Sequence, residues 1–574
     1  TTASNNTALG QGSLGANTTG ASNTAVGKSA LTANTTGASN VAVGYQALTA
    51  NTTGQLLTAV GYQALAANSA DTYSTALGAR TLQSNTTGFE NVAVGDLSSN
   101  ANTTGGYNVS VGNRSLQAST TGYRNTAVGH SAGMALTTGQ NNVAIGKDAM
   151  IALTTGTGNV AIGKDALDAI TTAGNTTAIG TSALSANTSG TSNTAVGHGT
   201  LAVNTTGGEN VALGYGALDS NTTASNNTGV GYLALQANTT GYSNSAIGAN
   251  SLDANTTGTA NSAFGHNALS ANTTATQNTA VGYSALKTNI TGTHNTAVGG
   301  LALEVNTTGS TNVAVGFATL DANTTGASNT GLGAYALSGN TTGAGNVAVG
   351  KDAMKTITTS GRCTAIGLSA LELNTEWDNT AVGYNALGLN TGGNNTAIGK
   401  DAGASTTTGV GNVFIGHKAG SGNHQADHGT LWIANQNVGP GNADMWIYGN
   451  GSGACHQGNN STSWSQTSDE RIKKDIVDST EGLAKIDALQ VRNFNFRTQA
   501  EVTVEGLQTS DAPGLQTGVI AQEIVTILPK AVSENSSGQK QVNTDPIFWA
   551  MVKAIQELST KNDALVARIT ALEA

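Results

Sequence analysis

One short segment in the C-terminal part of the chain places a serine beside acidic and basic residues, S-D-E-R-I-K-K-D-I from Ser468 to Ile476. A serine hydroxyl becomes a nucleophile when a neighbouring base takes its proton. By spacing alone, however, the segment is typical of a helix start. Ser468 would be the N-cap, and Asp469 and Glu470 would oppose the helix dipole in the first turn. Spacing therefore favours a structural role for these residues.

Two other groups of residues could hold a metal ion or form a disulfide. His424, Asp427 and His428 form H-x-x-D-H, and three chains around an axis could supply such groups as metal ligands, but we interpret the segment as a polar loop. Cys363 and Cys455 are separated by several copies of a repeat, beyond the roughly 7 Å limit on Cα separation. We expect no disulfide within the chain, while contact between chains near a threefold axis stays open. We expect no metal and no cofactor.

The elements that must position these groups follow a long repeat. The phrase N-T-A-V-G, or a close variant, returns with a constant period of seventeen positions from Asn6 to Cys363 and again at Asn379, Asn395 and Asn412, in twenty-five copies. One copy has too few residues to close a core, so each copy must be one rung of a stacked array. The rung reads N-T-A-V-G-Y-x-A-L-x-A-N-T-T-G-x-x, and we number its positions from the asparagine, which is position 1.

Two aliphatic positions predict how a rung folds. Position 4 is Val, Ile or Leu except at Phe264, position 5 is Gly in every copy, and position 9 is Leu or Met except at Ser99, Gly133, Gly403 and Gly420. Anchors at positions 4 and 9 indicate a flattened coil with two short strands and two corners per rung. Gly and Asn at the corners tolerate positive φ. We expect the N-x-T sequences at these turns to form structural asparagine ladders.

Other architectures fit the repeat less well. A triangular left-handed helix would need three anchors spaced by six, and a calcium-binding nonapeptide roll would need an aspartate in every turn. The abundance of Asn, Thr, Gly and Ala could also indicate disorder or an amyloid-like array. Aliphatic residues stay in phase through all twenty-five copies, however, and the first proline is Pro440. This pattern indicates uninterrupted backbone ladders.

The thinness of the rung predicts an oligomer. One Val and one Leu per rung bury little apolar surface against the entropy of ordering a whole rung, so we expect tight contacts of the small residues at positions 3 and 8, including contacts with other chains. The phrase resembles the N-S-V-A-I-G repeat in the β-roll heads of trimeric autotransporter adhesins, with Asn142 to Gly146 as the closest match. This resemblance covers about residues 6–420 and implies three packed rolls.

Charge and hydropathy exclude several classes of partner. The chain has a net charge of −10 and only 10% charged residues, which does not suit nucleic acid or an anionic membrane surface. No stretch approaches the roughly 20 apolar residues of a transmembrane helix. We therefore expect no nucleic acid partner and no membrane insertion. Because the sequence begins at Thr1 without a methionine, we expect a fragment or a processed form.

Composition divides the chain into three predicted regions. Residues 1–420 form the repeat shaft, and residues 421–467 form a β cap that covers the open edge of the last rung, with strand-like patches from Leu431 and Met445. Residues 468–574 hold almost half of the charged side chains of the whole chain. We expect residues 468–574 to be a separate α+β domain.

Four motifs in this last region occur in the order of a known family. They are the segment Ser468–Ile476, G-V-I-A-Q-E at 518–523, L-P-K-A-V at 528–532 and A-I-Q-E-L at 554–558. The region resembles the C-terminal intramolecular chaperone of endosialidase tailspikes and other phage fibres, a self-cleaving peptidase family also found in the myelin regulatory factor. One departure is V-N-T-D-P-I-F at 542–548, where family members more often have a tyrosine after the aspartate.

The resemblance implies a Ser-Lys dyad of Ser468 and Lys473 that cuts the chain once, between Thr467 and Ser468. Lysine can serve as the base only if burial or neighbouring cations lower its pKa from about 10.4. Arg471 and Lys474 could supply this cationic environment, and Lys474 is the alternative base.

The last segment carries a heptad pattern that predicts a coiled coil. Its a positions are Phe548, Ile555, Asn562 and Ile569, and its d positions are Met551, Leu558, Leu565 and Leu572. Ile at a with Leu at d is more typical of dimers. The family resemblance implies a trimer instead, and we follow it.

These features predict a homotrimeric fibre of a phage tail or related injection machine, located in a virion or outside the cell, that binds a host receptor or glycan. A bacterial cell-surface trimeric adhesin is the alternative. A glycan-degrading tailspike would need paired carboxylates in a cleft, but acidic residues are scattered through the rungs. An ice-binding face would need aligned threonines, whereas neighbouring threonines of a strand point to opposite sides.

Overall fold

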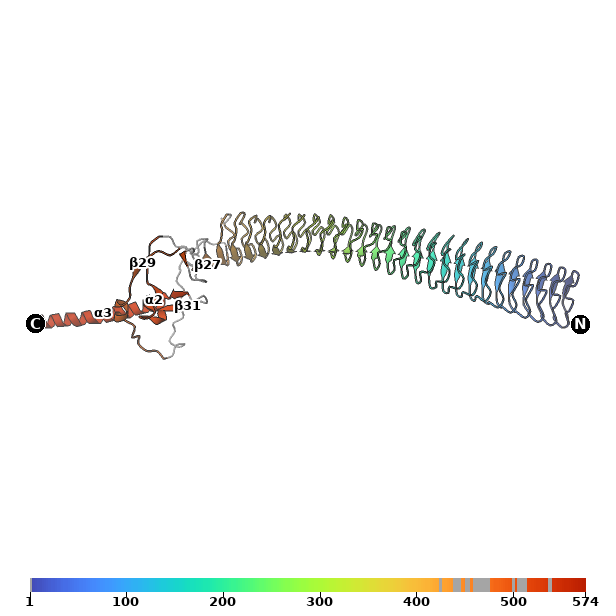
Figure 1. The fold of residues 1–574 in the computed structure, drawn as a ribbon, viewed down its shortest axis with the longest axis horizontal. Helices are drawn as coiled ribbons and strands as arrows, with labels where there is room; N and C mark the ends of the chain where they lie inside the picture. The colour runs from blue at the N-terminus through green and yellow to red at the C-terminus, as the bar shows by residue number, and fades with distance from the viewer. Residues whose placement is uncertain are drawn as a thin grey trace. The chain divides into compact units, whose positions relative to one another are not determined.

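The chain folds into two compact units, Thr1–Trp464 and Ser465–Ala574. The computed structural model describes residues 3–422, 426–436, 445–449, 455–457, 475–497, 501–502, 514–534 and 539–574. The first unit contains a parallel β-solenoid of twenty-five rungs (Figure 1), which confirms the fold class predicted from the repeat.

Each rung contributes one short strand to a continuous sheet. The strands are β1 (Thr7–Leu9), β2 (Thr24–Val26), β3 (Val41–Val43), β4 (Thr58–Val60), β5 (Thr75–Leu77), β6 (Val92–Val94), β7 (Val109–Val111), β8 (Thr126–Val128), β9 (Val143–Ile145), β10 (Val160–Ile162), β11 (Thr177–Ile179), β12 (Thr194–Val196), β13 (Val211–Leu213), β14 (Thr228–Val230), β15 (Ser245–Ile247), β16 (Ser262–Phe264), β17 (Thr279–Val281), β18 (Thr296–Val298), β19 (Val313–Val315), β20 (Thr330–Leu332), β21 (Val347–Val349), β22 (Thr364–Ile366), β23 (Thr380–Val382), β24 (Thr396–Ile398) and β25 (Val413–Ile415).

The strands pair in parallel with identical rung positions opposite one another. Thr24 pairs with Val41 and Ala25 with Ala42, so that each residue meets its equivalent one full repeat later. The repeat is one position shorter where Thr364 pairs with Thr380, and the pairing of equivalent positions is kept. The register therefore follows the repeat phrase itself, including its changes of spacing.

The wall opposite the sheet is a series of turns, so the prediction of two strands per rung is wrong. In rung 2, Ser29 and Leu31 have φ values of 59° and 52°, and Leu31 N donates to Ala47 O of the next rung at 3.0 Å. Because the chain turns at these residues, the adjacent side chains of Ala30 and Leu31 are both fully buried. An extended strand would point them to opposite sides.

The small residue at position 3, and not the aliphatic residue at position 4, faces the interior. Ala25 is fully buried, whereas its neighbour Val26 is only half-buried. Side chains alternate along a strand, so positions 2 and 4 both face outward when position 3 faces in. The prediction that position 4 anchors the core is therefore wrong, while position 9 is buried as predicted, for example at Leu31.

Two ladders of buried asparagines run between rungs, and the one at position 12, which opens N-T-T, is the ladder predicted for the N-x-T sequences. At position 1, Asn40 N donates to Asn23 Oδ1 at 2.9 Å. At position 12, Asn51 Nδ2 donates to Asn34 Oδ1 at 3.0 Å. At position 12 one side-chain amide thus bonds to the next, and at position 1 the side-chain oxygen accepts from a backbone N–H of the next rung. Both ladders satisfy polar groups that would be costly to bury alone.

Close backbone contact explains the invariant glycine at position 5. Gly44 has a φ of 139°, and a Cβ atom there would lie 2.3 Å from Gly61 O in the next rung. Any side chain would therefore clash with backbone and also strain φ. This position allows neighbouring rungs to approach at the corner of the coil.

In the last two rungs, a larger residue at position 3 is matched by smaller residues at position 9. Phe414 fills position 3 of the last rung and is fully buried. The leucine of position 9 is replaced by Gly403 and Gly420 in the last two rungs, and a Cβ at Gly420 would lie 2.2 Å from Phe414 Cδ1. The large ring thus occupies the space that the two leucines would need.

Beyond the last rung the sheet continues into a small irregular region. β26 (Leu431–Ala434) pairs in parallel with β25, and β27 (Met445–Gly449) and β28 (Cys455–Gln457) add antiparallel pairs. Trp432 is 5% exposed and belongs to the same core as Phe414. Aromatic side chains therefore close the interior where the repeat ends.

The second unit is a small α+β domain. Its elements are α1 (Leu483–Asp487), β29 (Arg492–Phe494), β30 (Gln516–Gly518), α2 (Ala521–Ile524), η3 (Pro529–Ala531), β31 (Val532–Glu534), β32 (Lys540–Val542) and α3 (Thr544–Glu573). β29 pairs antiparallel with β30, and β31 pairs antiparallel with β32. Ile524, Leu528, Ala531 and Ala550 form its buried core.

One rung carries a buried carboxylate in place of the usual glycine. Asp71 occupies position 15 of rung 4 and is 2% exposed, and its Oδ2 accepts a hydrogen bond from Asn85 Nδ2 at 3.2 Å. Burial raises the pKa of Asp71 to about 6, against smaller opposing effects of hydrogen bonds from Ser74 and other neighbours. The folded rung therefore binds a proton more tightly than the unfolded chain does.

This difference predicts that rung 4 becomes more stable on acidification. The free energy of local opening should rise as pH falls through 6 and reach its full gain below about 4, by up to roughly 3 kcal/mol. Hydrogen exchange of residues 66–90 between pH 4 and pH 7.5 would measure it. Asp71→Asn is the control, and the same pH response in that variant would contradict the assignment.

Candidate functional site

The predicted cleavage residues lie outside the described part of the chain. Thr467, Ser468, Lys473 and the alternative base Lys474 all fall between the described residues Gln457 and Asp475. The Ser-Lys dyad therefore stays a prediction. The described structure gives the domain that follows these residues.

The other three motifs meet in the core of this domain. Ile524, which directly follows G-V-I-A-Q-E, and Leu528 of L-P-K-A-V are fully buried in one cluster. Ala554 of A-I-Q-E-L is buried on α3. Each of these motifs thus contains or adjoins buried packing residues, while other side chains of the motifs, such as Ile555 and Leu558, are exposed.

Polar contacts between elements complete this framework. Glu557 Oε2 on α3 accepts a hydrogen bond from Leu483 N at the start of α1, at 2.9 Å. Lys485 Nζ donates to Ile527 O at 2.8 Å. Arg492 forms a two-pronged ion pair with Glu523, with N–O distances of 3.0 and 3.1 Å. These bonds fix α1 and β29 to α3 and α2, respectively.

The first half of α3 has two apolar faces. Ile547, Ala550 and Ala554 face the core of the domain. They are spaced by three and four residues and therefore lie on one face of the helix. The sequence analysis did not predict this inward face, because the heptad pattern of the same helix is stronger. The spacing of its three residues can nevertheless be read from the sequence.

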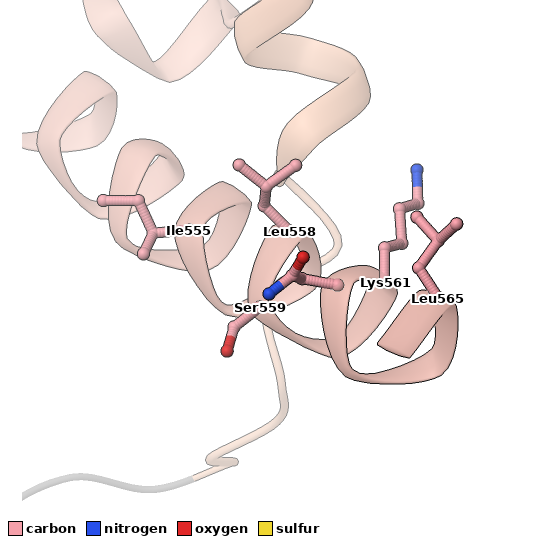
Figure 2. A pocket seen from close by; sticks show the side chains of 6 residues that line it. Ile555, Leu558, Ser559, Lys561 and Leu565 are labelled. Carbon is pink, nitrogen blue, oxygen red and sulfur yellow. The ribbon is translucent and has the colours of Figure 1, made fainter. Parts of the chain in front are cut away.

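The second face of α3 is the predicted heptad stripe. All eight predicted residues lie on α3, and its apolar side chains are exposed, from 47% at Met551 to 85% at Leu572. Figure 2 shows Ile555, Leu558 and Leu565 along the helix, with Ser559 and Lys561 between them; Asn562 also lines this groove. The stripe is continuous over the helix and has the spacing of a coiled-coil seam. Trp549, which is 63% exposed, adds a large apolar side chain beside Phe548.

A second apolar surface lies on the solenoid. We call the outward side of β1–β25, formed by positions 2 and 4, the sheet face. Position 2 is Thr, Val or Ser and position 4 is aliphatic or Phe in all twenty-five rungs, so the sheet face carries no charge. Leu77, Ile247 and Leu332 on it are 46%, 44% and 46% exposed. Position 4 thus forms a continuous row of exposed aliphatic side chains, beside Thr, Val or Ser at position 2, and the sheet face is a candidate interaction surface.

The remaining candidate residues do not form a metal or redox centre among the described residues. His424 lies outside the described residues, His428 Nδ1 accepts a hydrogen bond from Val410 N at 3.1 Å, and the described part of the chain contains no cluster of metal-ligating side chains. Cys363 is a buried free thiol whose Sγ lies 3.3 Å from Glu376 O. Burial raises the pKa of the Cys363 thiol, which makes it a poor nucleophile.

The heptad stripe predicts that α3 holds copies of the chain together. In a Ser468→Ala background, Ile555→Glu with Leu558→Glu should abolish assembly into an oligomer of one defined mass, because the stripe would carry charges at its centre. Sedimentation of the full chain would measure the mass.

The control is Thr560→Glu with Ala567→Glu, which adds the same charge at outward heptad positions and should leave the mass unchanged. Equal masses for the two pairs of variants would show that the stripe does not mediate association.

Two further findings bear on the role of the chain. Within the described residues, no helix combines the length and the apolarity needed to cross a membrane. Residues 468–533 match the family model described as chaperone of endosialidase. This match begins at Ser468 and includes two of the motifs that pack in the domain core, so the C-terminal unit carries a chaperone-of-endosialidase domain behind a β-solenoid.

Proposed function

We propose that this chain is the subunit of a homotrimeric extracellular fibre, such as a phage tail fibre, that attaches to a host cell surface. Its C-terminal domain acts as an intramolecular chaperone, aligns three chains and then cuts itself off between Thr467 and Ser468. The observation that carries this proposal is the placement of the chaperone-of-endosialidase match, at residues 468–533, behind a solenoid of twenty-five rungs.

The proposed cut is an acyl transfer followed by hydrolysis. Lys473 takes the proton of the Ser468 hydroxyl, and Ser468 Oγ attacks the carbonyl carbon of Thr467. The peptide bond breaks as an ester forms, and the nitrogen of Ser468 becomes a free amine. Water then hydrolyses the ester and leaves a carboxylate at Thr467. Lysine can act as this base only if its pKa is lowered by burial or by nearby cations.

The sheet face supports association of the shafts. At a strand spacing of about 4.8 Å, twenty-five rungs extend about 120 Å. With a width of about 8 Å, the sheet face would bury on the order of 1,000 Å² per chain in total, divided in a trimer between two partners; a standard pairwise interface buries roughly 800 Å² per partner. Another copy has the same rise per rung, so its aliphatic side chains can meet this surface along its whole length.

Register explains why such a fibre would need a chaperone. Neighbouring rungs have nearly the same sequence, so two shafts can pair one rung out of step at little local cost. A C-terminal domain that joins three chains first removes this ambiguity and lowers the entropy cost of the first contacts. Its removal afterwards would leave a kinetically trapped product.

Cleavage provides the direct test of the dyad. The wild-type chain should give two fragments, residues 1–467 and residues 468–574, because Ser468 and Lys473 supply the nucleophile and the base. Ser468→Ala and Lys473→Ala should each remain uncut on denaturing gels and by intact mass. Lys474→Ala is the matched control and should be cut. Cleavage that persisted in both of the first two variants would exclude the dyad.

The sheet face gives a second test, which concerns assembly and not cleavage. Ile247→Glu with Phe264→Glu should lower the temperature at which the fibre dissociates by several degrees, because buried unpaired charges are costly. Ala249→Glu with His266→Glu places the same charges at position 6 of the same two rungs and should have little effect. Thermal dissociation followed by light scattering would compare them, and equal losses would show that the sheet face is not an interface.

A further inference from the structure

The wall of turns contains a trough that the repeat does not explain. Gly199 and Gly216 occupy position 7 of rungs 12 and 13, the only consecutive rungs in which this position is glycine. The space above them encloses about 280 Å³. We call this space the trough, and it is of a size that suits one or two small rings.

The fold does not require glycine at this place. Gly199 has a φ of 65°, and a Cβ atom there would meet nothing within 4 Å. Asn250 and Asn267 occupy the same position in later rungs with φ values of 52° and 57°. A side chain could therefore be accommodated at Gly199, and its absence leaves the trough open.

One side of the trough is an aromatic ladder. His198 and Tyr215 are parallel with ring centroids 5.5 Å apart, and Tyr215 and Tyr232 follow at 5.7 Å. The two tyrosines are each 54% exposed. Of these rings, His198 and Tyr215 line the trough, and because Tyr215 is stacked on both sides, its edge is what a ligand could reach.

The other side and both ends of the trough carry different chemistry. Asp219 and Gln236 at position 10 form the opposite side, and Ser182 and Leu233 at position 7 close the two ends. A carboxylate accepts hydrogen bonds, an amide donates and accepts them, and a hydroxyl does both. The trough thus combines apolar ring surface with several hydrogen-bonding groups in a space two rungs long.

We propose that the trough binds a neutral saccharide of one or two rings. Its hydroxyl groups would donate to Asp219 and exchange hydrogen bonds with Gln236 and Ser182, while its oxygen atoms face the partly positive edge of Tyr215. The site is on the wall of turns and not on the sheet face, so it stays accessible in a fibre that buries the sheet face. The proposal depends neither on the cleavage nor on the oligomeric state.

Charge distinguishes a neutral sugar from other small ligands. No lysine or arginine lines the trough, and His198 is its one lining residue that could carry a positive charge, so an acidic sugar would meet the carboxylate of Asp219 with little counter-charge. A cation would be attracted by aromatic faces, but these faces are stacked on each other, and ring edges carry partial positive charge. Affinity at one shallow site would be low, and several copies in one fibre would raise it by avidity.

The full chain can be tested with defined sugars. Saturation-transfer NMR with cellobiose, lactose, maltose and N,N′-diacetylchitobiose, with 3′-sialyllactose as the acidic comparison, should show millimolar binding of at least one neutral disaccharide. Gly199→Asn, which fills the trough with a residue that this position accepts elsewhere, should weaken binding at least fivefold. Tyr215→Ala should have a similar effect.

Tyr45→Ala is the matched control, because Tyr45 stacks on Tyr62 at position 6 of rungs in which position 7 is glutamine. It should leave binding unchanged. The proposal would be wrong if none of the four neutral disaccharides bound, if binding survived both Gly199→Asn and Tyr215→Ala, or if sialyllactose bound more tightly than lactose.

Discussion

The hydrogen-bonded stacking of one rung on the next is the constraint on which the whole shaft depends. Strand residues, turn residues and buried asparagines all bond to the equivalent or adjacent position one rung away. Because the rungs must approach within strand spacing at every corner, position 5 can only be glycine. At position 1 a buried asparagine oxygen needs only a backbone N–H in the next rung, so Leu57 and Cys363 can follow an asparagine there. The invariant glycine is thus a requirement of the stacking.

Periodicity alone was sufficient to predict the stack but not the inside of a rung. The phase of the aliphatic residues gave the number of rungs, their parallel pairing and the asparagine ladders. It did not show which side chains of T-A-V face the interior. A strand of three residues can point either its middle residue or its two outer residues inward, and the larger residue was the expected one. The interior accepts Ala25 against Leu31 and has no room for Val26 as well. The turn wall was missed for another reason: leucine at positive φ is unusual, and each such residue costs about 1 to 3 kcal/mol unless its surroundings hold it.

The candidate site was predictable to different degrees. The exposed stripe of α3 follows directly from heptad spacing, since a helix has a fixed period. The second face of the same helix is defined by Ala550 and Ala554. An alanine side chain is small and contributes little to a hydrophobic pattern, so this face is hard to recognise in the sequence. The role of Ser468 came only from the family resemblance, because the reactivity of a serine depends on neighbours in space that spacing along the chain does not reveal.

In the proposed assembly, the two units meet opposite needs. A surface that is the same at every rung offers a large contact area, but it has twenty-five nearly equivalent registers and therefore specifies none of them. The single helix α3, with one polar residue among its a and d positions, Asn562, offers less area but one preferred alignment, because that amide is costly unless it meets its own copies. The sheet face thus supplies contact area and α3 supplies the register, so the two surfaces complement each other. In such a design the terminal domain is needed while the first rungs meet, and it becomes dispensable once the sheet faces have closed.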